Sequence, residues 1–362
     1  MTLALFVVGV VALILGAEML VRGASRLAAT AGISPLVIGL TVVAFGTSSP
    51  ELAVSLGAVS AGQSDIAMGN VVGSNVLNVL LILGASAVIV PLVVAQQLLR
   101  LDVPLMIAAS VLLLVLALDG SIGRLDGILL FGCLVAYIVF LIVQSRRERD
   151  PAVLGEYAQA YGRRPAGGLL RQLALVAAGL VLLVIGSGWL VDGAVVFARW
   201  MGVSELVIGL TVVAIGTSLP EIAASIIAAL KGERDIAVGN VVGSNIFNIL
   251  CVLGLSSILA PEGIAVALSV LSFDLPVMIA VAVACLPIFF TGWRVDRWEG
   301  AVFLGYYVCY TSYLVLRATE HDALGHFSRI MVAFVLPITA LTLAIITYRA
   351  WRAHVPRPER SD

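Results

Sequence analysis

The chain has 362 residues, 61% of them hydrophobic and only 12% charged, and its mean hydropathy of +1.11 excludes a water-soluble domain, whose surface needs more charge. The composition therefore indicates a polytopic membrane protein. A formal net charge of -1 gives no indication of a nucleic-acid or acidic partner, and four cysteines scattered singly through apolar stretches indicate neither a disulfide framework nor a thiolate metal site.

Eleven apolar windows are long enough to cross a hydrocarbon layer of about 30 Å, which takes about 20 residues. We expect all of them to be helical, because a membrane barrel would show alternating strands of about ten residues. No basic stretch precedes the first window, so we interpret it as a retained helix rather than a signal peptide. The predicted spans are 3 to 21, 35 to 60, 66 to 93, 102 to 118, 125 to 144, 168 to 197, 204 to 230, 236 to 259, 271 to 291, 298 to 316 and 327 to 348.

The distribution of basic residues predicts the orientation of these spans. The longest polar connection, from Arg146 to Arg171, is rich in arginine, so we place it in the cytoplasm. Eleven alternating spans then put the N-terminus outside and the C-terminus in the cytoplasm. With this assignment all but four of the 21 lysines and arginines fall on the cytoplasmic side, the exceptions being Arg124, Arg199, Arg317 and Arg329.

A shift of 170 residues aligns two halves of the chain. The segment "GLTVVAFGTSSPE" (Gly39 to Glu51) matches "GLTVVAIGTSLPE" (Gly209 to Glu221) at eleven of thirteen positions. Likewise, "DIAMGNVVGSNVLNVLLILG" from Asp65 matches "DIAVGNVVGSNIFNILCVLG" from Asp235 at fourteen of twenty. Each copy holds five predicted helices, and because five is odd the second copy enters the membrane from the opposite face. Many secondary transporters have such inverted repeats, with a site near the midplane where the repeats meet.

The predicted fold is therefore an all-α polytopic membrane protein made of two inverted five-helix repeats and one extra C-terminal helix. We assign residues 1–145 to the first repeat, 146–167 to a cytoplasmic connecting loop, 168–318 to the second repeat, and 319–362 to the extra helix and a cytoplasmic tail.

Polar residues fall on one helical face in two spans of each copy. In the second span these polar residues occupy positions i, i+3, i+4 and i+7, and in the third span they occupy positions i, i+4 and i+8. Prolines at Pro50 and Pro220 are expected to loosen the backbone carbonyls around Ala44 to Thr47 and Ala214 to Thr217 from helical bonding. In lipid, a cation, a neighbouring helix or water must then satisfy those carbonyls.

Two glutamates within these faces, Glu51 and Glu221, require neutralisation, because an unpaired charge at the bilayer centre costs several kcal/mol. No lysine or arginine lies at comparable depth in the sequence, so a proton or a metal cation must neutralise them. The surrounding groups are all oxygens, which Na⁺ and Ca²⁺ prefer, whereas softer metals favour His or Cys. Buried Ser and Thr more often bond a neighbouring helix than an ion, so for each hydroxyl both interpretations stay open. For Glu18 and Asp192, which lie near helix ends, the sequence does not decide between a functional and a structural role.

At these motifs the sequence resembles the calcium/cation antiporter superfamily, specifically its prokaryotic sodium/calcium exchanger branch. The doubled "GTSxPE" and "GNVVGSN" segments carry the resemblance, which covers the first ten spans. It implies ion sites between the second, third, seventh and eighth spans, where Na⁺ and Ca²⁺ compete, and a first and sixth span that slide together to alternate access. The implied metal ligands are Ala44, Thr47, Ser48, Glu51, Ser74 and Asn78 in the first copy, and Ala214, Thr217, Ser218, Glu221, Ser244 and Asn248 in the second.

Two departures from the family refine this expectation. Several relatives, including potassium-dependent exchangers, carry Asp where this chain has Asn248, which disfavours K⁺ co-transport. The connection between the halves is too short for the large calcium-sensing domain of animal exchangers.

We therefore expect a secondary antiporter of a prokaryotic plasma (inner) membrane that exchanges Na⁺ for Ca²⁺, with no cofactor and with the monomer as a candidate transport unit. A Ca²⁺/H⁺ antiporter is the nearest alternative, because a buried glutamate can take a proton. Proton-coupled relatives usually carry a "GNxxE" motif, where this chain reads "GNVVG". A cation channel fits an inverted repeat with a midplane site poorly. An enzyme is the weakest alternative, because no nucleophile has a histidine at membrane depth.

Overall fold

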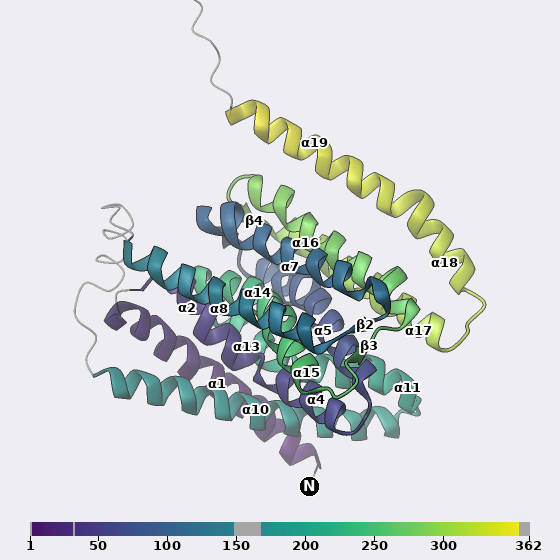
Figure 1. Ribbon diagram of the computed structural model, residues 1–362, viewed down its shortest axis with the longest axis horizontal. Helices are drawn as coiled ribbons and strands as arrows, with labels where there is room; N and C mark the ends of the chain where they lie inside the picture. The colour runs from purple at the N-terminus through teal and green to yellow at the C-terminus, as the bar shows by residue number, and fades with distance from the viewer. Residues whose placement is uncertain (1, 32, 148–167, 355–362) are drawn as a thin grey trace, which may run out of the picture.

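The computed structural model describes residues 2–31, 33–147 and 168–354, and helices account for most of them (Figure 1). The elements of the first half are α1 (Thr2–Ala31), α2 (Pro35–Ile38), the π-helix η1 (Gly39–Val43), α3 (Ala44–Thr47), α4 (Ser49–Ser60), α5 (Ser64–Leu77), the π-helix η2 (Asn78–Leu83), α6 (Gly84–Ile89), β1 (Leu92–Val93), the π-helix η3 (Leu98–Asp102), α7 (Val103–Leu116), the 3₁₀-helix η4 (Ala117–Asp119), β2 (Ser121–Ile122) and α8 (Arg124–Arg147).

Apart from the 3₁₀-helix η4, the second half repeats this order of elements, from its long first helix to its last strand and helix. It comprises α10 (Leu169–Trp200), α11 (Glu205–Ile208), the π-helix η5 (Gly209–Val213), α12 (Ala214–Thr217), α13 (Leu219–Leu230), α14 (Arg234–Phe247), the π-helix η6 (Asn248–Leu253), α15 (Gly254–Leu259), β3 (Ile264–Ala265), the π-helix η7 (Val270–Asp274), α16 (Leu275–Phe290), β4 (Arg294–Val295) and α17 (Arg297–Ala318). The chain then continues through α18 (Leu324–Ile330), the π-helix η8 (Met331–Val335) and α19 (Leu336–His354).

Every predicted span overlaps a helical segment, and the prediction of a helical multi-pass membrane protein is confirmed at that level, apart from four strands of two residues each. Within the described residues, eight helices are long and apolar enough to cross a membrane, or up to nine if the bent pair Pro35–Thr47 and Ser49–Ser60 forms one span. The count of eleven crossings and the inverted orientation of the halves stay predictions. The predicted cytoplasmic loop at 146–167 lies, beyond its first two residues, outside the described residues.

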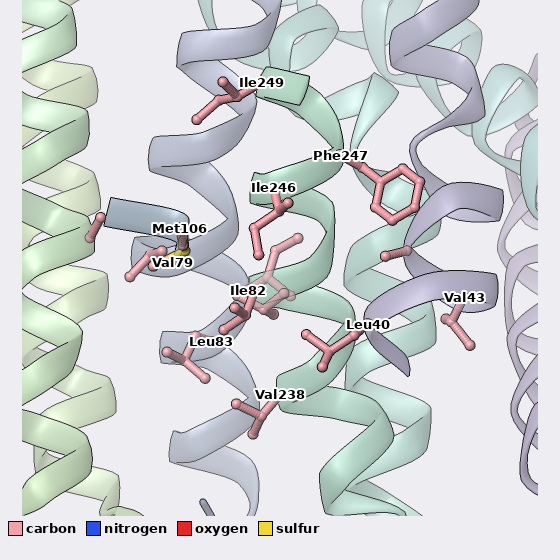
Figure 2. Packing of buried hydrophobic residues seen from close by; sticks show 14 of the residues in the cluster. Leu40, Val43, Val79, Ile82, Leu83, Met106, Val238, Ile246, Phe247 and Ile249 are labelled. Carbon is pink, nitrogen blue, oxygen red and sulfur yellow. The ribbon is translucent and has the colours of Figure 1, made fainter. Parts of the chain in front are cut away.

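The core of the molecule is the crossing of α14 and η6 with the second and third spans of the first half. Every residue from Ile236 to Gly254 is buried. Figure 2 shows Leu40 of η1 and Ile82 of η2 on either side of the α14 backbone, and both side chains are fully buried. The first half thus packs against the second along the same segments that carry the predicted ligands.

Two short antiparallel ladders also join the halves. Strand β1 pairs with β4, with Leu92 opposite Val295, and β2 pairs with β3, with Ile122 opposite Ile264. Helix α19 lies at the edge of the molecule, against α16, and no described residue of α19 is buried (Figure 1).

Helices α1 and α10 pack against each other along a seam of glycines (Figure 1). Gly9 and Gly16 face Gly186 and Gly179, so each helix repeats its small residue after seven positions. A Cβ atom on Gly16 would lie 2.8 Å from the Gly179 carbonyl oxygen, and one on Gly186 would lie 2.9 Å from that of Gly9. The absence of side chains lets the two backbones touch, as in membrane helix pairs joined by small residues.

We expect Gly186→Val to destabilise the protein by about 1–3 kcal/mol or more, because the added side chain overlaps the α1 backbone. Gly188→Val is the matched control, since a Cβ on Gly188, two residues along α10, has no described atom within 4 Å. Thermal unfolding of the detergent-solubilised variants measures the difference. Equal unfolding midpoints for the two variants would show that the close approach is not required.

Candidate cation-binding site

Both copies break their second span at the motif that contains the glutamate. The chain bends by 42° between Thr47 and Ser49, and Ser48 leaves helical geometry with φ −80° and ψ 5°. Pro50 then lies in the first turn of α4, and Pro220 in that of α13, where a missing N–H costs no helical hydrogen bond. The break also puts Glu51 in the first turn of a helix, whose N-terminal partial charge favours a carboxylate.

The expected loosening of the carbonyls is wrong for Ala44. Its carbonyl accepts the Ser48 N–H at 3.0 Å and the Thr47 hydroxyl at 3.4 Å. The carbonyl that loses its helical donor is that of Gly46, four residues before Pro50. In the second copy the Ser218 N–H donates to Ile215 at 3.1 Å instead, so the two copies differ at this point.

The two glutamates are held by serines of the opposite copy. Ser218 Oγ donates to Glu51 Oε1 at 2.9 Å, and Ser48 Oγ donates to Glu221 Oε1 at 3.2 Å. Both glutamates are almost completely buried, at 0% and 1% exposed. Ser218 also lies 3.4 Å from Ser74 Oγ, which brings α5 to the same point. No ion pair among the described residues involves either glutamate.

Several predicted ligand oxygens have no hydrogen-bond partner. Within the described part of the chain, nine buried side-chain atoms lack a partner, and five of them belong to the predicted set: Glu51 Oε2, Asn78 Oδ1, Glu221 Oε2, Ser244 Oγ and Asn248 Oδ1. Buried polar atoms are normally paired, so such a cluster needs an explanation. Asn78 begins η2, which packs against α13, the helix of Glu221, and Asn248 begins η6, which packs against α4, the helix of Glu51. A hard cation would find only oxygen ligands here.

The two copies differ in how deeply corresponding residues of the site are buried. Ala44 and Thr47 are fully buried, and Thr47 Oγ1 donates to Asn240 Oδ1 at 3.1 Å. Their counterparts differ, because Ala214 is exposed and Thr217 is half-buried. The described structure is therefore asymmetric at residues that are identical in sequence.

Asn70 and Asn240, on the polar face of the third and eighth spans, bind the backbone of the two glutamates. Asn70 Nδ2 donates to the backbone carbonyl of Glu51 at 3.1 Å, and Asn240 Nδ2 reaches that of Glu221 at 3.5 Å. They bond carbonyls close to the helix break. The repetition of this asparagine in both copies indicates a role, but helical spacing does not predict a hydrogen bond to the backbone of the glutamate.

The ambiguous acids lie away from the site. Glu18 pairs with Arg22 and, at 3.0 Å, with Lys231 in the turn between α13 and α14. Asp192 is exposed on α10. Glu18 therefore ties α1 to the turn between α13 and α14.

Broken membrane helices around two buried carboxylates, lined by hydroxyls and amides, define a membrane transporter of hard cations. The model for the sodium/calcium exchanger protein family matches residues 1–143 and 171–316, so the chain belongs to that family of transporters.

Relatives and solved structures agree with this family. The chain is 42% identical over 307 residues to the putative antiporter CaxA of Alkalimonas amylolytica, covering 84% of this chain and 95% of the relative. It is 35% identical over 338 residues to the sodium/calcium exchanger MaX1 of Methanosarcina acetivorans, covering 84% and 96%. A solved structure of the sodium-calcium exchanger NCX_Mj, soaked without Na⁺ and Ca²⁺, matches with a TM-score of 0.73 and 29% identity over 86% of this chain and 98% of that one. Other structures of that exchanger were soaked with Na⁺ together with Ca²⁺ or Sr²⁺.

Proposed function

We propose that this protein exchanges Na⁺ for Ca²⁺ at one site between its two halves, which opens alternately to the two sides of a prokaryotic plasma membrane. The observation that carries the proposal is the pair of buried glutamates, each bonded by a serine of the other copy and each with one carboxylate oxygen that has no partner among the described residues. The proposed ligands are Ala44, Thr47, Ser48, Glu51, Ser74, Asn78, Ala214, Thr217, Ser218, Glu221, Ser244 and Asn248. Both glutamates come from one chain, so a monomer suffices, and the transported ions are the only ligands required.

Charge neutralisation would couple the two ion fluxes. Two carboxylates carry two negative charges, which one Ca²⁺ neutralises and Na⁺ ions can replace. An empty, doubly negative site is disfavoured inside the membrane, so the protein changes its open side only when loaded. Ca²⁺ movement in one direction then requires Na⁺ movement in the other.

Alternating access follows from the proposed inverted repeats, residues 1–145 and 168–318, with 146–167 as the cytoplasmic connection and 319–362 as the extra helix and tail. The repeat in sequence, the repeated element order and the arginine distribution support this arrangement. With the N-terminus outside, the exposed Ala214 and the half-buried Thr217 lie on the external side and the buried Ala44 and Thr47 on the cytoplasmic side. Exchanging these two environments would open the site inward.

Proteoliposomes loaded with Na⁺ test the coupling. We expect external Ca²⁺ to enter only while the outward Na⁺ gradient lasts, and to enter equally after an ionophore collapses any pH gradient. Protein-free liposomes and vesicles with equal Na⁺ on both sides are the controls. Uptake driven by a pH gradient without Na⁺ would replace this proposal by Ca²⁺/H⁺ exchange, and single-channel currents would replace it by a channel.

A further inference from the structure

Two buried asparagines outside the predicted ligand set occupy the crossing of α5 and α14. Asn75 and Asn245 are each 2% exposed and are separated by the repeat distance of 170 residues. Asn75 Nδ2 donates to the backbone carbonyl of Asn245 at 3.2 Å, so the two residues meet where the copies cross.

Each of these asparagines binds the ligand amide of the other copy. Asn245 Oδ1 accepts a hydrogen bond from Asn78 Nδ2 at 3.0 Å, and Asn75 Oδ1 accepts one from Asn248 Nδ2 at 3.1 Å. An amide has its oxygen and its NH₂ group on opposite sides. Holding the Nδ2 atoms of Asn78 and Asn248 therefore directs their Oδ1 atoms away, and both of these Oδ1 atoms lack a hydrogen-bond partner among the described residues.

The orientation of Asn75 and Asn245 is itself determined by methionines. Asn245 Nδ2 donates to Met106 Sδ at 3.3 Å, and Asn75 Nδ2 lies 3.6 Å from Met278 Sδ. A thioether sulfur can only accept, so it favours the NH₂ group of the asparagine and leaves the Oδ1 atom facing the ligand amide.

The helices that bring these methionines are anchored one turn earlier in each copy. Asp102 of η3 accepts a hydrogen bond from Tyr137 of α8 at 3.0 Å, and Asp274 of η7 accepts one from Tyr310 of α17, also at 3.0 Å. The same chain of contacts therefore runs from the periphery to the site in both halves.

From these contacts we infer that Asn75 and Asn245 are positioning residues that orient the amides of Asn248 and Asn78 so that oxygen, and not NH₂, faces the transported cation. The inference rests on the proposed ligand role of Asn78 and Asn248. Each copy thereby orients a ligand of the other. An amide released from this contact can turn its NH₂ group, the positive end of its dipole, toward the cation.

A double-mutant cycle tests the inference. Ca²⁺ binding to the detergent-solubilised full chain is measured by calorimetry for the wild type, Asn245→Leu, Asn78→Ala and the double variant. We expect Asn245→Leu to weaken Ca²⁺ binding by about 10–100-fold, the usual range for losing the hydrogen-bond partner of a metal ligand. In the Asn78→Ala background the same change is expected to have no further effect, because no amide is left to orient. Ser257→Ala, which removes a buried hydroxyl bonded only to Leu253 in its own helix, is the matched control and keeps wild-type affinity.

The outcomes separate this inference from the proposed exchange. An equal loss of affinity from Asn245→Leu in both backgrounds, or unchanged affinity with a lowered unfolding temperature, would overturn the positioning role and leave only a packing role. If Asn78→Ala binds Ca²⁺ like the wild type, the ligand assignment fails, and the positioning role fails with it. The measurement does not depend on the coupling ion, so failure of Na⁺-driven uptake leaves it intact. Asn245→Ala and the symmetric cycle of Asn75→Leu with Asn248→Ala provide independent replacements if leucine does not fold at this crossing.

Discussion

Glu51→Gln and Glu221→Gln are each expected to reduce Na⁺-dependent Ca²⁺ uptake by about 100-fold or more. Either change leaves one carboxylate against a divalent ion, so the loaded site keeps an uncompensated positive charge. Such a charge at mid-membrane costs at least about 2.5 kcal/mol, and every 1.4 kcal/mol is a factor of about ten. The amide also replaces the carboxylate oxygen that accepts the bond from the serine of the opposite copy at each position.

The control for this prediction is the same substitution, glutamate to glutamine, at a glutamate that lies outside the site. Glu262 is exposed in the turn before β3, and Glu262→Gln is expected to transport like the wild type. Initial rates of radioactive Ca²⁺ uptake into Na⁺-loaded proteoliposomes, corrected for the amount of reconstituted protein, give the comparison. A Glu51→Gln variant that retains the rate of Glu262→Gln would contradict the assignment of the charge to this pair.

Asn248→Asp is expected to tighten Ca²⁺ binding by about tenfold while slowing Ca²⁺ transport at neutral pH by a similar factor. A third carboxylate attracts the cation more strongly, but the Ca²⁺-loaded site is then left with one negative charge, which disfavours its movement through the membrane interior. Protonation of the added carboxyl restores neutrality, so transport by the variant should recover as the pH falls. The wild type should instead lose transport at acidic pH, because protons compete with Ca²⁺ for its two glutamates.

Asn78→Asp, the symmetric position in the first copy, is the matched comparison and should behave alike. Calorimetric Ca²⁺ affinity and uptake rates across a pH series separate the binding effect from the transport effect. A variant whose affinity and rate change in the same direction at neutral pH would show that the net charge of the loaded site does not limit the exchange.

The repeat in the sequence was sufficient to bring Glu51 and Glu221 into one predicted site. Glu51 and Glu221 share a motif with a serine three positions earlier, and a duplicated buried charge has few purposes in lipid. The structure brings each of these glutamates to the opposite copy's serine, a pairing that helical spacing cannot predict because it joins residues far apart in the chain. The position of the helix break was predicted only approximately, since the proline starts the new helix and the bend falls at Ser48.

Asn75 and Asn245 show the limit of reasoning from periodicity. Each follows a predicted ligand serine by one position, which turns it about 100° away from the polar stripe, and a helical projection therefore assigns it to packing. Only the crossing of α5 over α14 brings each amide to the ligand of the other copy.

The sequence by itself determined the membrane class, the duplication and the oxygen-rich chemistry around two glutamates, because composition and local spacing are properties of the chain alone. The tertiary structure decided which copy supplies the partner of each ligand and how deeply the ligands of each copy are buried. Those features depend on contacts between helices about 170 residues apart in the chain. Identical residues of the two matching motifs, such as Ala44 and Ala214, therefore have different surroundings.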